Sequence, residues 1–559
     1  MNAAEKQVLA ARAALAGAHL APAPGSPEER ARFADLQRRL APLFRRAFPD
    51  RLSPQTIVVL PSMTLDGAEL RKLTGAPHYE ERLLCMLMLL RRPRNRVVYL
   101  TSQPVPESLV DYYLHLLPGI PFSHARRRLT LLSCHDGSAA PLTHKVLRRP
   151  LLLERIRAAI PDPRMAHLTC FNATALERTL AVQLGVPLYA CDPALADLGS
   201  KSGGREVFRR AGVALPDGFE RLRDARDVAG ALAALRRADP GLRRAVVKLE
   251  EGFSGEGNAV FAFDGAPAGE GLERWVRETL PARLRFEAAE ETWEAYAGKL
   301  GEMGGIVEAW VDGAEARSPS VQCRIDPLGR SAVISTHDQV LGGPTGQVFQ
   351  GCTFPADPAY TPGIQDAALR VSRTLAGEGA LGRFGVDFVS VRRGGKWESL
   401  AIEINLRKGG TTHPYLMLQY LTDGVYDPES GLYRTPAGRL CFYHATDNLR
   451  DPAYAGLTPD DLIELAVTNE LHFHAASQRG VVFHMIGALS EHGKLGAVCI
   501  GESPAAAARL HADTVATLDR EARRQRRRPA SHPTAPRRAP VRRRARTLRS
   551  TRPSAGPPG

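Results

Sequence analysis

The chain has 559 residues, 44% hydrophobic and 24% charged, an ordinary balance for a globular protein of several domains. It contains no unbroken apolar run long enough to span a bilayer, and residues 1–25 lack the parts of a secretory signal, so we expect a cytoplasmic protein without a membrane partner. The net charge of +14 is misleading, because residues 522–559 hold thirteen arginines and no acidic residue, which leaves only +1 for the rest.

The N-terminal third alternates between two patterns. Residues 1–50 are expected to form helices interrupted by APAPGSP, and residues 51–191 alternate apolar runs with helical periodicity. Such alternation predicts a parallel, doubly wound sheet, and without a G-x-G-x-x-G after the first strand no dinucleotide site is predicted. The expected strands are TIVVL (56–60), RVVYL (96–100), LTLLSC (129–134), HLTCF (167–171) and VPLYAC (186–191), and the expected helices are 80–92, 106–117 and 173–185.

The pattern of apolar and polar residues changes after residue 191. We expect one domain over 192–440, beginning with a helix in GREVFRRAG and followed by AVVKLE, NAVFAF and GIVEAWV as strands. A β-rich section follows, with VQCRID, SAVISTHDQV, RFGVDFVSV and WESLAIEINLR as strands.

The end of the chain predicts a smaller unit over 441–520 and a disordered arginine-rich tail over 521–559. In the smaller unit, TPDDLIELAVTNEL predicts a helix with Thr458 as its N-cap and Pro459 at its first position. GVVFHMIGAL and KLGAVCIG predict a hairpin. The tail is too poor in apolar side chains to fold.

The stretch VVKLEEGFSGEGNAV (246–260) places a lysine on a strand beside a glycine-rich loop. Val246, Lys248 and Glu250 share one face because side chains alternate along a strand. Glycines allow the backbone N–H groups of the loop to approach an anion closely, so strand and loop together suit a polyphosphate. Taken alone, the pattern favours a surface hairpin with an exposed lysine over a polyphosphate site.

A second cluster contains two carboxylates. Glu403, Asn405 and Arg407 share one strand face, and the segment RRGGK predicts a hairpin with the preceding strand. With a three-residue loop, Gly394–Lys396, Asp387 lies opposite Glu403, whereas a two-residue loop places them on opposite faces. In the first register two carboxylates and an amide oxygen converge into a magnesium site, with Arg407 beside it to stabilise phosphoryl charge.

In this order the motifs resemble the ATP-grasp superfamily of carboxylate–amine ligases. Lys201, eleven residues before Gly212 in an A-G-V-x-x-P turn, is similar to the first ATP lysine of such enzymes, and Lys248 is similar to the second. The resemblance extends over roughly 198–420. By resemblance, the ATP-binding residues are Lys201, Lys248, Gly255, Glu256 and Gly257 of the phosphate-covering loop, Glu308, Trp310 and Val311 of the adenine hinge, and Glu315 at the ribose.

The resemblance also implies the catalytic and metal-binding residues. Asp387, Glu403 and Asn405 match the metal ligands, and Arg407 resembles the catalytic arginine of members with E-x-N-x-R, with Lys248 assisting. The chain departs from the pattern at Gly385, where some members have an arginine, so Arg407 has to supply that charge. The implied cofactors are ATP and Mg²⁺, as two ions, with Mn²⁺ as a substitute.

The flanking segments resemble the pheganomycin-type peptide ligases. STHDQVLGGPTGQVFQGCTFPA, the preceding α/β domain and the unit from CFYHATDNL to GVVFHMIGAL carry this resemblance. The implied fold is a pre-ATP-grasp, Rossmann-like domain (51–191), an ATP-grasp domain (192–440) with its lid at about 212–310, a small C-terminal α+β domain and a disordered tail.

The implied function is an ATP-dependent ligase that joins an amino-acid-like carboxylate to a peptide amine through an acyl phosphate, in natural-product biosynthesis. Segments 337–353 and Thr411–His413 are expected to shape the pockets for these small-molecule substrates. Two alternatives stay open: a ligase making a small dipeptide or amino-acid amide, and an inactive nucleotide-sensing protein associated with nucleic acid through its basic tail. Nucleic acid is otherwise expected only as a non-specific partner of the tail, and a homo-oligomer is left open.

Overall fold

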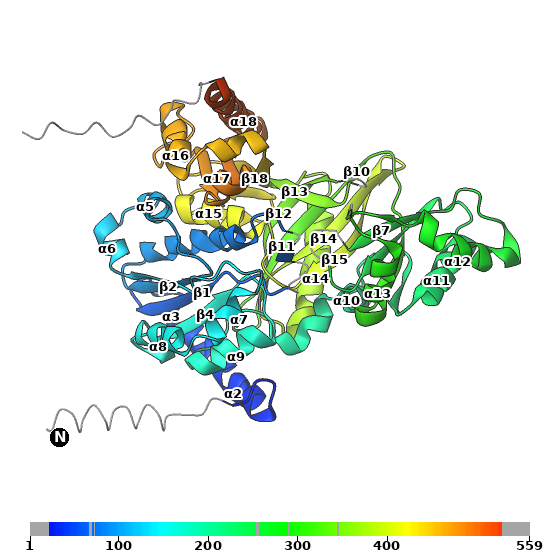
Figure 1. Ribbon diagram of the computed structural model, residues 1–559, viewed down its shortest axis with the longest axis horizontal. Helices are drawn as coiled ribbons and strands as arrows, with labels where there is room; N and C mark the ends of the chain where they lie inside the picture. The colour runs from blue at the N-terminus through cyan, green and yellow to red at the C-terminus, as the bar shows by residue number, and fades with distance from the viewer. Residues whose placement is uncertain are drawn as a thin grey trace, which may run out of the picture.

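The structure is a computed structural model that describes residues 22–65, 70–71, 73–252, 257–288, 290–343 and 346–527. Figure 1 shows three parts around a central sheet: an N-terminal α/β domain, a lid at the opposite end, and a C-terminal unit above the N-terminal domain. Gly255, Glu256 and the tail from residue 528 lie outside the described residues. Within those residues, no helix combines the length and apolarity needed to cross a bilayer.

The N-terminal domain contains a four-stranded parallel sheet in the order β3-β2-β1-β4. Along β1, Ile57 and Val59 enter one core cluster while Val58 and Leu60 enter another, so both faces are covered. The predicted doubly wound sheet is therefore confirmed. Its strands are β1 (Gln55–Leu60), β2 (Asn95–Thr101), β3 (Leu129–Ser133) and β4 (Ala166–Cys170). Its helices are α2 (Pro27–Gln37), α3 (Leu40–Ala47), α5 (Glu107–His115), α6 (Phe122–Arg126), α7 (Leu142–Leu147), α8 (Pro150–Ala158) and α9 (Ala175–Leu184), with 3-10 helices η1 (Ala76–Arg91), η2 (Pro163–Met165) and η3 (Pro193–Gly199).

One prediction for this domain is wrong in detail. The segment 186–191 is not a strand: in the described part of the chain it meets β4 only at the Leu168–Leu188 bridge, beside Pro187, which has no N–H to extend a ladder. The helix expected over 80–92 is present as η1, which is wound with 3-10 hydrogen bonds. Nothing in the sequence of this largely buried run explains that winding.

The lid is a five-stranded sheet in the order β5-β9-β6-β7-β8 with helices on one face. Ala245, Val247 and Leu249 of β6 pack under those helices, so the alternate positions of the same strand face away from them. The strands are β5 (Gly218–Leu222), β6 (Arg244–Leu249), β7 (Asn258–Ala262), β8 (Arg285–Phe286) and β9 (Gly305–Ala309). The helices are α11 (Ala225–Ala238), α12 (Leu272–Arg283) and α13 (Trp293–Met303), with the 3-10 turn η4 (Gly269–Gly271).

The central sheet has nine strands, in the order β10-β14-β11-β12-β13-β18-β20-β19, with β15 paired to β14. Helices α10 and α14 pack on its β11–β14 part, and α15 packs on η1. The strands before residue 441 are β10 (Ala316–Arg317), β11 (Pro319–Ile325), β12 (Ser331–Gly342), β13 (Val348–Phe354), β14 (Gly382–Arg393) and β15 (Lys396–Asn405). The helices are α10 (Lys201–Arg210), α14 (Thr361–Gly377) and α15 (Thr412–Thr422), and a small separate ribbon pairs β16 (Val425–Asp427) with β17 (Leu432–Arg434).

The C-terminal unit continues the central sheet instead of forming a sheet of its own. β18 pairs with β13, so the boundary expected at 441 falls inside one sheet, and β19 and β20 pair antiparallel as predicted but with α17 between them. Thr458 caps α16 as predicted. Residues 521–527, expected in the disordered tail, instead belong to α18, which continues to Arg527 and buries Ala522. The elements are β18 (Phe442–Arg450), η5 (Pro452–Gly456), α16 (Pro459–Thr468), β19 (Gly480–His484), α17 (Ala488–His492), β20 (Lys494–Gly501) and α18 (Pro504–Arg527).

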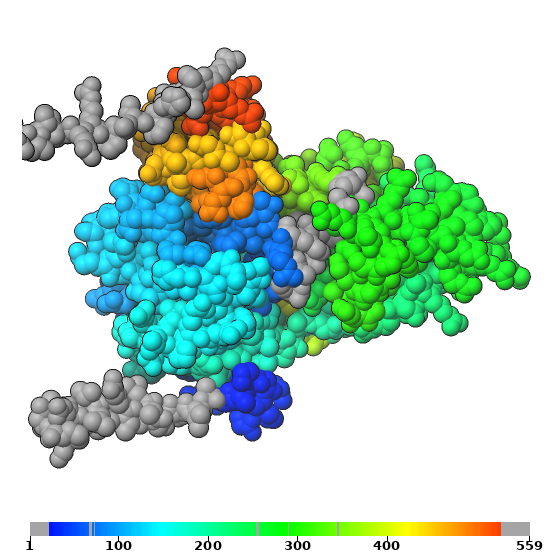
Figure 2. Space-filling view, in the orientation of Figure 1, coloured from blue at the N-terminus to red at the C-terminus, as the bar shows by residue number. Residues whose placement is uncertain are grey.

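One apolar core joins the N-terminal domain to the C-terminal unit. It contains Val59 and Tyr99 of the parallel sheet, Leu418 of α15 and Val498 of β20. In the space-filling view the C-terminal unit, yellow to red, lies directly on the blue N-terminal domain, with the green lid at the other end (Figure 2). The N-terminal domain, central sheet and C-terminal unit thus form one framework.

This continuity predicts that the C-terminal unit is required for folding. A chain ending at residue 440 loses β18, so the edge of β13 and part of the shared core become exposed, and it should aggregate instead of eluting as a monomer. A chain ending at Arg527 is the matched control and should elute and melt like the parent. A monomeric 1–440 chain with the parent's melting temperature would contradict the prediction.

A buried histidine predicts weaker stability in acid. His337 of β12 lies beside the stacked rings of Phe354 and Tyr443 and shares a hydrogen bond with the Tyr443 hydroxyl (2.6 Å), and burial lowers its pKa to about 3. The unfolded chain takes up a proton near the ordinary pKa of 6.5 while the folded chain does not, so folding stability falls as pH drops below 6.5.

His337→Phe removes this proton from the folding equilibrium. Although the variant loses the hydrogen bond to Tyr443, its stability relative to the parent should rise by about 2 kcal/mol between pH 7 and pH 5. Urea unfolding at both pH values measures the change, with exposed His474→Ala as the control. An unchanged difference between His337→Phe and the parent would rule out this source of acid sensitivity.

Candidate active site

A cavity of about 940 Å³ lies where the lid, the central sheet, the N-terminal domain and the C-terminal unit meet. The lid contributes Lys248 and Glu308, the central sheet Asp387 and Glu403, and the other two parts the remaining wall. Most residues singled out in the sequence therefore converge on one space, although they are spread over more than two hundred positions.

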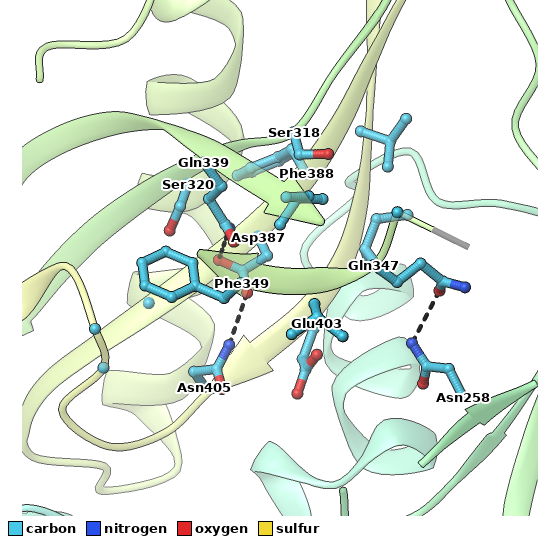
Figure 3. A pocket seen from close by; sticks show the side chains of 18 of the residues that line it. Asn258, Ser318, Ser320, Gln339, Gln347, Phe349, Asp387, Phe388, Glu403 and Asn405 are labelled. Atoms are coloured by element: carbon cyan, nitrogen blue, oxygen red, sulfur yellow. Dashed lines mark hydrogen bonds between the residues drawn. The ribbon is translucent and has the colours of Figure 1, made fainter. Parts of the chain in front are cut away.

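The β14–β15 hairpin places the two carboxylates side by side by a route that the sequence did not predict. The turn has two residues, Gly394 and Gly395, both with positive φ, so the predicted three-residue loop is wrong. A bulge at Ile402 shifts the register by one residue and restores the pairing of Asp387 with Glu403. The expected pairing is therefore present, and Figure 3 shows both side chains at the cavity.

Asp387 is held by two amide donors. Gln339 Nε2 donates to its Oδ1 (3.0 Å) and Asn405 Nδ2 to its Oδ2 (2.8 Å) (Figure 3). Burial and the neighbouring charge of Glu403 raise the pKa of Asp387 to about 6. Because the Asn405 amide nitrogen faces Asp387, its amide oxygen is left as an acceptor for another group.

The pKa of Glu403 is shifted in the opposite direction from that of Asp387. Burial alone would raise its pKa, but the Lys201 ammonium, 2.5 Å from Oε1, together with Lys248 and Arg407, lowers it below the ordinary value. Lys201 is the first residue of α10, which is capped by the Ser200 side chain, so the helix start fixes its position. The predicted lysine and metal ligand are thus in direct contact.

These oxygens suit a hard divalent cation. Two carboxylates and one amide oxygen are the ligand types that Mg²⁺ prefers, and it usually completes its shell with water and phosphate oxygens. The donor set at Asp387, Glu403 and Asn405 therefore fits the predicted metal.

Arg407 follows directly after β15 and lines the same cavity. Its Nη1 donates to the Lys408 carbonyl (3.0 Å), and its guanidinium lies 5.7 Å from the centre of the Phe171 ring. A Cβ atom at Gly385 would lie 2.7 Å from Nε2 of Gln322, so the glycine is packed closely beneath that side chain.

The lid wall carries a buried ion network. The Lys248 ammonium lies 2.5 Å from Oε2 of Glu308, with both side chains under 10% exposed, and Arg205 pairs with the other oxygen. Arg205 also pairs with Glu220. Lys248 and Glu308 were predicted, but Arg205 was missed because it sits inside α10 without a motif of its own.

The predicted hinge is only partly on the cavity wall. Trp310 and Val311 line the cavity, and the Arg244 guanidinium lies 4.3 Å from the centre of the Trp310 ring. Glu315, expected at the ribose, is 45% exposed, pairs with Arg392 (3.6 Å) and does not line the cavity. Asp312 lies on the wall instead, bonded to Arg244 (2.9 Å).

The glycine-rich loop is described only at its ends. The backbones of Gly252 and Gly257 pack against each other, whereas Gly255 and Glu256 lie outside the described residues. Next to the loop, Asn258 Nδ2 donates to Gln347 Oε1 (2.9 Å), which joins the lid to the central sheet (Figure 3).

Of the two segments expected to shape the substrate pockets, 337–353 and Thr411–His413, some residues line the cavity and others are buried in the core. Asp338, Gln347 and Phe349 line the cavity, as does Thr411. His413 is instead buried in a contact with His484 (2.8 Å between the Nε2 atoms).

Three cavity residues were missed altogether. Arg82 of η1, Asp447 of β18 and Lys494 of β20 line the wall opposite the lid and are at most 6% exposed. They come from three distant segments, so no spacing in the sequence relates them. Arg82 stands directly before the apolar run of EERLLCMLMLL, after two glutamates, and nothing in that pattern indicates a place in the site.

Two family models match parts of the chain: "IQCH-like, ATP-grasp" over residues 278–429 and "PGM1 C-terminal domain" over 461–514. An L-propargylglycine–L-glutamate ligase from Streptantibioticus cattleyicolor is 34% identical over 436 residues, covering 76% of this chain and 86% of that protein. IQ motif-containing protein H from Danio rerio is 23% identical over 381 residues, covering 60% of this chain and 36% of that protein.

Two solved structures are similar at low identity. A biotin carboxylase from Campylobacter jejuni has a TM-score of 0.49 at 12% identity, covering 82% of this chain and 89% of that one. An N5-carboxyaminoimidazole ribonucleotide synthetase from Thermus thermophilus has a TM-score of 0.46 at 16% identity, covering 83% and 98%.

The relative from Streptantibioticus cattleyicolor and the ATP-grasp family match therefore decide the family. The chain belongs to the ATP-grasp superfamily of carboxylate–amine ligases, ATP-dependent enzymes that form C–N bonds, and within it to the pheganomycin-type peptide ligases.

The lid network predicts the effect of losing one lysine. Lys248→Met leaves Glu308 paired with Arg205, so the fold should persist, while the Kd for MgATP should rise about ten-fold or more through loss of a charge-assisted contact. Lys299→Met is the matched control, because Lys299 pairs with Glu291 at the same 2.5 Å distance on the lid but away from the cavity wall. Equal MgATP affinity of the two variants in calorimetry would remove Lys248 from the nucleotide site.

Proposed function

We propose that the protein joins an amino-acid-like carboxylate to the amine of an amino acid or peptide in cytoplasmic natural-product biosynthesis, cleaving ATP to ADP and phosphate. One observation carries the proposal. Lys248 and Glu308 face Asp387, Glu403 and Arg407 across a single cavity, so cations for phosphates and oxygens for a metal share one space.

ATP would bind between the lid and the central sheet. Lys201 and Lys248 would exchange their glutamate partners for phosphate oxygens, since each ammonium already lies on the cavity wall. The backbone of Trp310 and Val311 would hold the adenine, and Asp312, placed on the wall where Glu315 is not, would take the ribose.

Asp387, Glu403 and Asn405 would hold Mg²⁺, as two ions, with Mn²⁺ able to substitute. When bound, Mg²⁺ neutralises charge on the β- and γ-phosphates. The raised pKa of Asp387 is consistent with this role, because two carboxylates side by side are favoured once a cation lies between them.

The substrate carboxylate would attack the γ-phosphorus, and the bond to the ADP oxygen would break. The amine nitrogen would then attack the acyl carbon, phosphate would leave, and the amine proton would pass to solvent. Arg407 would stabilise the transferring phosphoryl group and the acyl phosphate, since no arginine stands at Gly385. Closure of the lid, through contacts such as Asn258 with Gln347, would exclude water from the acyl phosphate.

A small dipeptide or amino-acid amide ligase is the second candidate, because the same residues would serve it and only the size of the amine differs. An inactive nucleotide sensor is not favoured. Lys201, Lys248, Glu403, Asn405 and Arg407 are all present and converge on one cavity, whereas an inactive relative would be expected to have lost some of them.

The product of nucleotide cleavage tests the mechanism. A panel of amino acids with hydroxylamine as the amine should release ADP and phosphate and form a hydroxamate, whereas an adenylating enzyme would form AMP and pyrophosphate. Glu403→Gln should reduce turnover about a hundred-fold or more, because phosphoryl transfer depends on the charge at that site. Arg407→Ala should lower kcat more than it changes the Kd for ATP.

Glu398→Gln on the same strand is the control, since Glu398 is exposed, pairs with Arg393 and lies off the cavity wall. It should retain the parent's turnover. AMP and pyrophosphate as products, or full activity of Glu403→Gln, would reject the mechanism.

A further inference from the structure

The cavity continues past Arg407 to a wall that the nucleotide and metal do not account for. The Phe171 ring links the two regions: the Arg407 guanidinium lies 5.7 Å from its centre and the Arg82 guanidinium 5.9 Å. Beyond it, the N-terminal domain contributes Tyr79 and Arg82, and the C-terminal unit Asp447 and Lys494.

The buried charges of this wall do not balance. Nη2 of Arg82 lies 2.6 Å from Oδ2 of Asp447, with both side chains 6% exposed, and this pair is neutral. The Lys494 ammonium donates only to the Tyr79 hydroxyl (2.8 Å), and within the described part of the chain no carboxylate forms an ion pair with it. Arg450, the neighbour of Lys494 across β18 and β20, adds a further positive charge on the cavity wall.

Arg82 also has an unsatisfied hydrogen-bond donor. Its Nε atom is buried and has no hydrogen-bond partner among the described residues, while its guanidinium lies 4.1 Å from the centre of the Tyr79 ring. Burying a cation without a counter-charge costs several kcal/mol, so such groups normally face an anionic partner. Two buried cations, one carboxylate and a phenol therefore point to an anionic ligand group at this wall.

We propose that this wall binds a carboxylate of a substrate, distinct from the carboxylate that is activated, through Lys494 and Arg82. The inference rests on the proposed ligase function and deepens it: at least one substrate is an amino acid or peptide with a free, non-reacting carboxylate. Phosphate is the less suitable occupant, because the cations placed for ATP, Lys201 and Lys248, lie on the other walls. The carboxylate belongs either to the acid substrate or to the amine substrate.

Lys494 is the better residue to test, because Arg82 is tied to Asp447 and its removal would leave that carboxylate buried and unpaired. Lys494→Met keeps the length of the side chain and removes the charge. Lys494→Arg keeps the charge, and Lys299→Met is the matched control on the lid.

The experiment compares carboxylates with their amides in two arms, with ADP release as the readout. The acid arm uses L-glutamate against L-isoglutamine and L-glutamine, which block the α- and the γ-carboxylate in turn, with hydroxylamine as the amine; the amide that still supports ADP release keeps the reacting carboxylate and is the one compared. The amine arm uses L-alanine against L-alaninamide, with the acid that gives most ADP. In one arm the parent should have a KM about ten-fold or more lower for the carboxylate, and Lys494→Met should abolish this difference with little change in kcat.

A purely structural role for these charges predicts a different outcome. It would lower the melting temperature of Lys494→Met and change KM equally for carboxylate and amide. That result, or no preference for the carboxylate in either arm of the parent, would overturn the inference while leaving the ligase intact. Absence of ADP with every acid would instead overturn the proposed function together with this inference, and recovery of the preference in Lys494→Arg would support both.

Discussion

Pairing of buried charges is the constraint on which the rest of this site depends. Glu308 can be buried because Lys248 and Arg205 bind its two oxygens, and the pKa of Glu403 stays low despite burial because Lys201 contacts it and Lys248 and Arg407 lie nearby. Arg205 and Lys201 both belong to α10, so a single helix supplies a cation to Glu308 on the lid and another to Glu403 on the β14–β15 hairpin. The helix thereby links the two walls of the cavity.

Much of the fold followed from the sequence because its signals are local. Apolar runs between helical segments predicted the strands of the parallel sheet, and Thr458 with Pro459 predicted the start of α16. One such prediction was wrong because of a proline. The run 186–191 is apolar enough for a strand, but Pro187 has no N–H to donate to β4. The boundary at 441 was misplaced because the pairing of β13 with β18 joins segments about ninety residues apart, which no local pattern reports.

The site was predictable only where its residues lie in one motif. Asp387, Glu403 and Asn405 were found because a hairpin brings them together, yet the turn length was wrong and the bulge at Ile402 compensates for it. A bulge changes the register without an evident mark in the sequence, so its position could not be inferred. Arg82, Asp447 and Lys494 meet only in the folded chain, which is why sequence reasoning did not relate them.

The single framework formed by the N-terminal domain, central sheet and C-terminal unit has a consequence for how such enzymes diversify. The lid holds Lys248 and Glu308 on a sheet with its own core, whereas Tyr79, Arg82 and Lys494 are built into the shared framework. With a substrate carboxylate bound at this wall as proposed, substitutions in η1 or β20 would alter which substrate is accepted while Lys248 and Glu308 stay in place on the lid. Selection for a new product would then act on the contact between the N-terminal domain and the C-terminal unit. The lid residues Lys248 and Glu308 could be inherited unchanged.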